Sequence, residues 1–220
     1  MEEPMSGLRL RGVEKRYDRF RLGPIDLEIG TGEVMGLEGS NGAGKSTLLR
    51  VAAGLLRVDA GSTEFDGRRL TVDTREAKGW FGFVSDDLAL YPDETVAWHL
   101  EICRRLLPRW DVGRALSLLD RFELDPLLRA RSLSRGQTRK AILTMALARR
   151  PRLLILDEPT EALDAPARVF LLGELRRMAA AERVSVLLAS HLADDFAALD
   201  ANLVRLSRGQ FVAQSTWSAA

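Results

Sequence analysis

One glycine-rich segment constrains the fold of this 220-residue chain more than any other feature. Residues 39 to 46 read Gly-Ser-Asn-Gly-Ala-Gly-Lys-Ser, which fits G-x-x-x-x-G-K-[ST] at every fixed position. The segment follows an apolar run, Glu33 to Leu37, and precedes a stretch of helical composition, Lys45 to Leu56. This order predicts a strand, a phosphate-binding loop and a helix.

The residue types of this segment explain why phosphate is the expected ligand. Gly42 and Gly44 allow backbone angles and close approaches that other residues resist, so that successive N–H groups and the helix N-terminus can point at phosphates. Lys45 adds a mobile positive charge, and the Ser46 hydroxyl is suited to bind Mg²⁺. The predicted nucleotide-binding residues here are Gly39, Ser40, Asn41, Gly42, Ala43, Gly44, Lys45, Ser46 and Thr47.

A second candidate site is a pair of carboxylates at the end of an apolar run. Leu153 to Leu156 predicts a buried strand, and Asp157 and Glu158 follow it directly. Ionised groups are costly to bury, so a buried strand that ends in two of them usually ends at a site. Asp157 is predicted to hold Mg²⁺ and Glu158 to act as the general base for an attacking water. The alternative is a strand that runs into a solvated loop.

The remaining pattern predicts an α/β protein. Strands and helices alternate in the last third, and the strands are apolar throughout, which is typical of a parallel sheet covered by helices. Residues 94 to 130 are helical in pattern, and their apolar stripes, which include Leu106 and Leu116, are predicted to be core. The other predicted elements are strands at Ile25 to Ile29, Ser62 to Phe65 and Val184 to Ala189, helices at Arg135 to Arg149 and Ala165 to Ala181, and a hairpin at Arg208-Gly209.

Composition excludes several classes of protein. Hydrophobic residues make up 46% and charged residues 29%, and the net charge is only +1, which argues against disorder and against binding nucleic acid through bulk charge. A single cysteine, Cys103, excludes a disulfide framework and a multi-cysteine metal site, and suits a reducing compartment. No window holds the eighteen apolar residues that a membrane span needs.

A short motif between these two sites suggests a family. Leu133, Ser134, Arg135, Gly136 and Gln137 open the predicted helix about twenty residues before the acidic pair. With the phosphate loop before it and the acidic pair after it, this segment resembles the LSGGQ signature of ABC transporter nucleotide-binding subunits. The resemblance covers about residues 7 to 213. It implies a P-loop NTPase fold with an antiparallel β subdomain, a catalytic core at about 7–93 and 133–213, and a helical subdomain at about 94–132.

Other residues take their roles from the resemblance. Tyr17 matches the aromatic that stacks on adenine, with Phe20 as the alternative. Asp164 lies in the loop that touches a partner subunit, and His191 matches the switch histidine that reaches the γ phosphate. His99 matches no family position and is predicted to be structural. The same five letters recur at residues 206–210, where they are predicted to be only a hairpin turn.

One position departs from the family pattern. The family usually has glutamine where this chain has Asp86, after Gly82-Phe83-Val84-Ser85. That glutamine ordinarily touches Mg²⁺ and the attacking water, close to where the membrane subunit docks. An aspartate keeps an oxygen ligand but is shorter and charged, so we expect Asp86 to remain close to the metal with altered coupling.

The resemblance implies an ATPase that powers transport. ATP and Mg²⁺ are its cofactors, and a second nucleotide-binding subunit, as a homodimer, completes each site with its signature segment. The resemblance also implies a separate membrane permease, predicted to be of the ABC-2 export type, that would hold the chain at the cytoplasmic face of the membrane. It implies no nucleic acid as a partner. Two alternatives remain: a soluble ABC-type ATPase without a permease, and an ATP sensor of low turnover.

Overall fold

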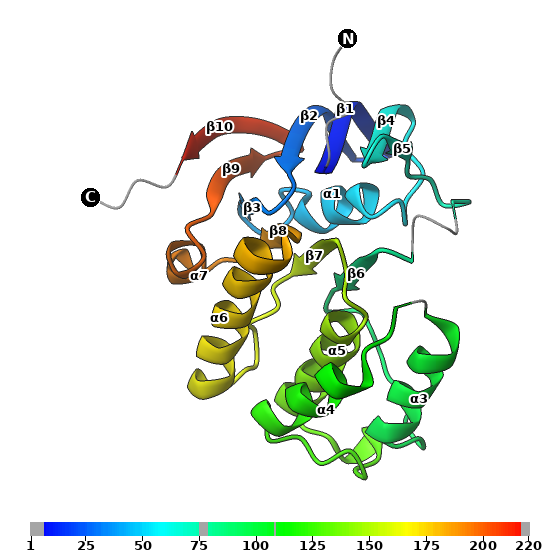
Figure 1. Ribbon diagram of the computed structural model, residues 1–220. Helices are drawn as coiled ribbons and strands as arrows, with labels where there is room; N and C mark the ends of the chain where they lie inside the picture. The colour runs from blue at the N-terminus through cyan, green and yellow to red at the C-terminus, as the bar shows by residue number, and fades with distance from the viewer. Residues whose placement is uncertain (1–6, 75–78, 108, 217–220) are drawn as a thin grey trace.

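An antiparallel sheet forms one end of the molecule. The computed structural model describes residues 7–74, 79–107 and 109–216, and Figure 1 shows this sheet at the top. Its strand order is β2-β1-β4-β5. Alternation in β2 buries Ile25, Leu27 and Ile29, as the period of two predicts. The strands are β1 (Gly7–Tyr17), β2 (Phe20–Gly30), β4 (Ala60–Phe65) and β5 (Arg68–Arg69).

A six-stranded sheet forms the centre. Its order is β10-β9-β3-β8-β7-β6, and every neighbouring pair is parallel except β9 with β10. The predicted parallel sheet is therefore confirmed, with one antiparallel strand at its edge. The strands are β3 (Val34–Glu38), β6 (Phe81–Val84), β7 (Leu153–Asp157), β8 (Ser185–Ala189), β9 (Asn202–Ser207) and β10 (Gln210–Thr216).

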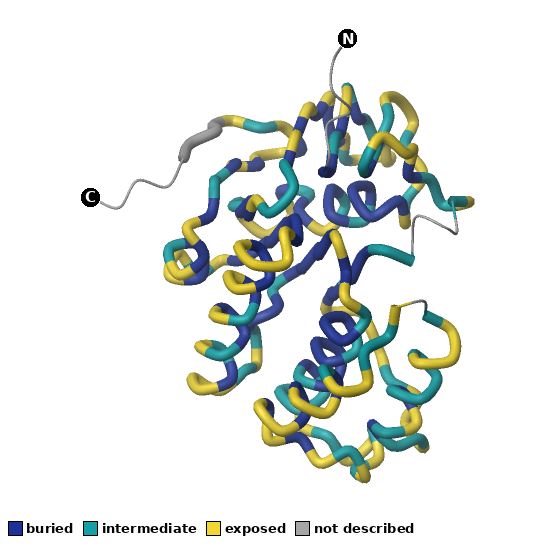
Figure 2. The backbone as a smooth tube through the Cα atoms, in the orientation of Figure 1, coloured by how far each residue is buried: buried dark blue, intermediate teal, exposed yellow. Residues whose placement is uncertain are grey.

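Both faces of the central sheet are covered, which explains its uninterrupted apolar strands. In β7, Leu153 and Ile155 join the core that contains α1 (Lys45–Ala52) and the antiparallel sheet. Leu154 and Leu156 join the opposite core. Figure 2 shows the central strands as the most buried part of the molecule. The helices of the opposite core include α5 (Arg135–Ala148), α6 (Ala165–Glu182) and α7 (Ala193–Ala198).

A helical lobe extends from this opposite core (Figure 1). It contains α3 (Val96–Leu106), α4 (Val112–Arg121) and the short 3-10 helix η1 (Ala130–Ser132), and both α3 and α4 contact α5. The prediction that the whole leucine stripe is core is wrong at Leu106 and Leu116, which are 74% and 60% exposed. Only the faces of α3 and α4 that contact α5 are covered, and these two side chains lie outside those faces.

Most predicted elements are confirmed within one or two residues. The helix predicted over Lys45 to Leu56 ends earlier, at Ala52, because Gly54 adopts φ 62° and closes the last turn by donating its N–H to Val51. The second LSRGQ copy is the turn between β9 and β10, with left-handed backbone at Arg208 and Gly209. Among the helices of the described residues, none is long and apolar enough to cross a bilayer.

The predicted structural role of His99 is also confirmed. The residue is buried, with 7% of its surface exposed. Nδ1 lies 2.7 Å from the Thr95 carbonyl oxygen, and Nε2 accepts the Tyr91 N–H at 2.9 Å. Because a carbonyl only accepts, Nδ1 carries the proton, and both ring nitrogens are engaged by backbone groups.

Candidate functional site

The phosphate loop forms the floor of a cavity of about 400 Å³. It connects β3 to α1, and Gly44, at φ 107°, is the N-cap of α1. The first backbone N–H groups of α1 therefore face the cavity without partners in the helix, which suits them to bind an anion. Ser40, Asn41, Gly42, Gly44, Lys45, Ser46 and Thr47 line the cavity with Phe20, Asp86, Asp157 and Glu158.

Lys45 is held in place by the loop itself. Its side chain folds back, and Nζ donates to the Gly39 carbonyl at 2.7 Å. Gly39 and Ala43 do not line the cavity, although both were predicted to bind nucleotide. Ala43 is buried, and its carbonyl accepts the Gly209 N–H. These two residues shape the loop, whereas the other residues from Ser40 to Thr47 line the ligand space.

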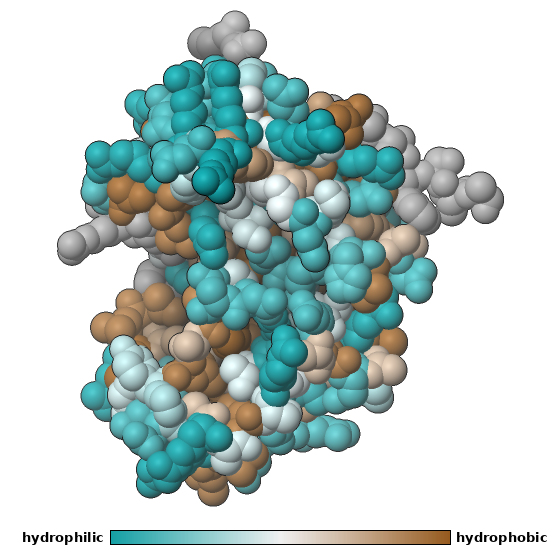
Figure 3. Space-filling view, turned by 180° about the vertical axis from the view of Figure 1, so that it is seen from behind, coloured by the Kyte–Doolittle hydropathy of each residue, from teal (hydrophilic) through white to brown (hydrophobic). Residues whose placement is uncertain are grey.

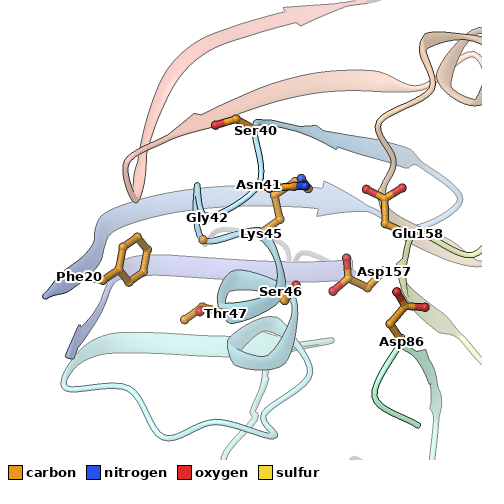
Figure 4. A pocket seen from close by; sticks show the side chains of 11 residues that line it. Phe20, Ser40, Asn41, Gly42, Lys45, Ser46, Thr47, Asp86, Asp157 and Glu158 are labelled. Atoms are coloured by element: carbon orange, nitrogen blue, oxygen red, sulfur yellow. The ribbon is translucent and has the colours of Figure 1, made fainter. Parts of the chain in front are cut away.

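The carboxylates lie on the opposite wall (Figure 4). Asp157 ends β7 and is 8% exposed, and Glu158 follows with a left-handed φ of 47°. A glutamate in this conformation is strained, which is a feature of functional sites. His191, after β8, lies against it: Nδ1 is 2.9 Å from Glu158 Oε2, and the His191 backbone N–H donates to the same oxygen at 3.1 Å. His191 does not line the cavity, but it orients the glutamate that does.

The donor set at the edge of the cavity fits magnesium. Ser46, Asp86 and Asp157 all line the cavity, and Figure 4 shows Asp157 between the other two. No group of three or more histidine, cysteine, aspartate or glutamate side chains that could hold a metal occurs within the described part of the chain. Magnesium is usually held by one or two carboxylates together with substrate phosphates and water, so these three oxygens are sufficient in combination with a nucleotide.

Comparison with known protein families agrees with this geometry. The model of the family described as ABC transporter matches residues 22–161. The chain belongs to the ABC transporter family. It is therefore an ATP-binding cassette, and the matched region contains the phosphate loop, the LSRGQ segment and the acidic pair.

Curated relatives of this cassette carry transport names. The sulfate/thiosulfate import ATP-binding protein CysA of Caulobacter vibrioides is 36% identical over 213 residues, which is 92% of this chain and 62% of that protein. The ABC transporter ATP-binding protein YtrB of Bacillus subtilis is 32% identical over 189 residues, covering 86% of this chain and 64% of that protein. The chain thus spans less than two thirds of the length of these relatives. Since one name says import and the other gives no direction, the ABC-2 export group stays a prediction.

Solved structures confirm the fold of the cassette. A structure described as the ATP-binding subunit of an ABC transporter superposes with a TM-score of 0.88 at 26% identity, covering 96% of this chain and 90% of that one. A dimeric ATP-binding cassette in a post-hydrolysis state, bound to ADP and phosphate, gives a TM-score of 0.85 at 23% identity, covering 97% of this chain and 100% of that one. The predicted P-loop NTPase core with an antiparallel subdomain and a helical subdomain is confirmed.

The signature segment faces a different cavity from the phosphate loop. Ser134 caps α5 by accepting the Gln137 N–H, and Gln137 Oε1 accepts the Ser134 N–H in return. Leu133 and Arg135 line a second cavity of about 280 Å³, and the Arg135 side chain is 82% exposed. Gly136 lies against the loop after β7, where a Cβ would be 2.6 Å from the Ala162 carbonyl oxygen. One chain therefore does not bring its own signature to its own phosphate loop.

The structure favours Phe20 over Tyr17 as the aromatic at the cavity. Phe20 lines the cavity, whereas Tyr17 does not and is 49% exposed. The centroids of the two rings are 6.3 Å apart. The Phe20 ring packs against Gly44, where a Cβ would lie 2.5 Å from Phe20 Cζ. Asp164 lines neither cavity: it caps α6 through the Ala167 N–H, and its hydrogen bond from Lys140, followed by that N–H, lowers its pKa.

Sequence reasoning missed two groups near the site. Arg139 of α5 forms an ion pair with Asp86 and is only 7% exposed. Asp195 of α7, fully buried, accepts hydrogen bonds from Ser190 and Thr160, next to the histidine and acidic loops. No motif marks either residue, because Arg139 is 53 residues from Asp86 and Asp195 is 35 residues from Thr160 in sequence, and these pairs meet only in the fold.

Proposed function

We propose that this chain is the ATP-hydrolysing subunit of a transporter whose membrane permease is a separate protein. The observation that carries the proposal is the separation of the two half-sites on one chain. The phosphate loop and catalytic carboxylates share one cavity, and the signature segment lines another. Two copies related by a two-fold axis would pair each phosphate loop with the signature of the other copy.

The roles of the residues follow from their positions. Lys45 and the N–H groups of the loop bind the phosphates, and Ser46, Asp86 and Asp157 would hold Mg²⁺, which neutralises phosphate charge when bound. Glu158 accepts a proton from the attacking water, and His191 fixes the orientation of that carboxylate through its ring and backbone N–H groups. Bound nucleotide thus serves both as the substrate and as part of the dimer contact.

An apolar groove on the helical lobe supports the proposal that a separate permease binds this chain. The groove has a volume of about 300 Å³ and lies between α3, α5 and the loop after β6. Figure 3 shows hydrophobic side chains gathered on this lobe. We propose that an amphipathic cytoplasmic segment of the permease binds here and holds the chain at the cytoplasmic face of the membrane. Its lining includes Phe83, Leu88, Leu90, Trp98, Ile102 and Met145.

Replacement of the general base tests the proposal. Glu158→Gln keeps the shape of the side chain but cannot accept a proton, so ATP binding is retained while turnover falls by about 10²- to 10⁴-fold. Because ATP is then not consumed, the variant accumulates as an ATP-bound dimer in size-exclusion chromatography. Glu28→Gln, on an exposed position of β2, is the matched control and leaves both properties unchanged. A Glu158→Gln protein that binds ATP but stays monomeric contradicts the paired sites.

A low-turnover ATP sensor is the second candidate. It is favoured by the pairing of Asp86 with Arg139, which differs from the neutral amide usual at this position. Steady-state phosphate release, measured with the purified chain alone and with its co-purified membrane partner, separates the two. A transport ATPase is stimulated by the partner, whereas a sensor binds ATP with a rate of hydrolysis near zero in both conditions.

A further inference from the structure

Asp86 and Arg139 form an ion pair at the edge of the ATP cavity. Asp86 lies just after β6 and lines the cavity together with Ser46 and Asp157. Arg139 extends from α5, and its Nη2 donates to Asp86 Oδ1. The Asp86 side chain is 58% exposed, whereas that of Arg139 is 7% exposed. The carboxylate therefore faces the ligand space, and the guanidinium lies behind it.

Arg139 is charged, buried and only partly satisfied. Burial lowers the pKa of its guanidinium, and the carboxylates of Glu161, Asp157 and Glu158, in that order, offset only part of this effect. A guanidinium remains protonated in any such setting. Its Nη1 atom is buried and has no hydrogen-bond partner. A buried cation with one unsatisfied donor destabilises the folded state unless its charge is paired. The contact with Asp86 is therefore expected to contribute more to stability than an exposed ion pair does.

We propose that Arg139 is the positioning residue that allows an aspartate to serve at position 86. The pair carries no net charge, and Asp86 Oδ2 remains free to contact the bound nucleotide and its metal. Without Arg139, a bare carboxylate would face the terminal phosphates and repel them. Without Asp86, a bare guanidinium would remain behind the site and attract them. This inference rests on the proposed ATP site.

The two single replacements should therefore shift ATP affinity in opposite directions. A unit charge about 8 Å from a phosphate, at an effective dielectric constant of about 40, changes affinity by about fivefold. In the absence of Mg²⁺, Arg139→Gln weakens binding of adenylyl imidodiphosphate by about this factor, and Asp86→Gln strengthens it by a similar factor. The double variant, which restores neutrality, returns to within about twofold of the original affinity.

Magnesium provides a second readout. The stimulation of analogue binding by Mg²⁺ is greatest in Arg139→Gln, where a free carboxylate faces the metal. It is smallest in Asp86→Gln, where the carboxylate is gone and a cation remains. Affinities are measured by isothermal titration calorimetry with Mg²⁺ or with a chelator. Thermal unfolding of each variant is recorded to verify folding, and the double variant covers the case in which Asp86→Gln alone is too unstable.

A neighbouring ion pair supplies the matched control. Asp87 pairs with Arg50 at 2.9 Å, one residue along the same loop, but both side chains are substantially exposed, at 62% and 41%. Asp87→Asn and Arg50→Gln make the same changes in charge where solvent screens them. We expect these two variants to alter analogue affinity by less than about twofold.

The outcomes decide between charge balance and simple structural support. Opposite shifts that cancel in the double variant support the proposal. Equal shifts in one direction, additive losses, or loss of thermal stability with no change in affinity overturn it. If the unaltered protein binds no ATP analogue, the proposed function fails rather than this inference.

Discussion

Asp195 is a fully buried carboxylate that joins three segments near the catalytic edge. Its Oδ2 accepts hydrogen bonds from Thr160 Oγ1 at 2.6 Å and from Ser190 Oγ at 2.7 Å. Its Oδ1 accepts from Arg168 Nε at 2.8 Å. Ser190 directly precedes His191, so the carboxylate fixes the loop that presents the histidine to the acidic pair.

Asp195→Asn tests this arrangement at nearly constant volume. The replacement removes the charge, turns the acceptor that faces the two hydroxyl groups into a donor, and leaves Arg168 with a neutral amide oxygen in place of its charged partner. Breaking a buried pair costs about 3–5 kcal/mol, and Arg168 is 29% exposed, so the low end of that range, about 3 kcal/mol, applies. For a chain of this size, that corresponds to a fall in Tm of about 6–12 °C.

Thermal unfolding and steady-state ATPase assays measure the two consequences. We expect kcat to fall about tenfold or more as His191 loses its position, with little change in KM. Arg168→Met is the companion variant, and combining it with Asp195→Asn should cost less than the sum of the single changes, because no stranded cation remains. The reasoning would be refuted if Asp195→Asn lowered Tm by less than about 2 °C. It would also be refuted if the losses of stability in the two single variants added up fully in the double variant.

Three further predictions concern separate features of the molecule. Phe20→Ala should weaken ATP binding about tenfold, as expected from the loss of about 1–3 kcal/mol of stacking, and Tyr17→Ala should weaken it less, in fluorescence titration with a nucleotide analogue. Gly136→Ala forces a Cβ to 2.6 Å from the Ala162 carbonyl oxygen and should lower the free energy of unfolding in urea by about 1–3 kcal/mol. Gly173→Ala, whose new Cβ meets no atom within 4 Å beyond the neighbouring backbone of its own helix, should raise it by about 0.5–1 kcal/mol. The Arg114 backbone N–H and then the Arg150 guanidinium lower the pKa of Asp111. The contribution of Asp111 to the free energy of unfolding is therefore present above about pH 4 and is lost as the pH falls through the lowered pKa. Asp111→Ala should cost about 1 kcal/mol of stability at pH 7 and much less at pH 2, as measured by urea unfolding at the two pH values.

The sequence determined the elements and the chemical groups that local spacing can encode. The phosphate loop, the acidic pair and the signature each lie within a few consecutive residues, and their order along the chain predicted the family and fold. Alternation in β2 and the apolar run of β7 predicted their strands, because burial on one face or both faces leaves a direct pattern.

Only the tertiary structure decided which of these residues meet. It placed Phe20 rather than Tyr17 at the cavity, left Leu106 and Leu116 exposed, and put the signature segment at a different cavity from the phosphate loop. It also paired Asp86 with Arg139, two residues separated by 53 positions.

The physical reason is that local patterns report backbone geometry and average burial, whereas partners depend on how elements pack. An arginine in a helix has the same sequence signal whether it faces water or a carboxylate. The sequence alone showed that Asp86 stands where the family usually has a glutamine. Its compensation by a buried cation became visible only when α5 was packed beside the loop that follows β6.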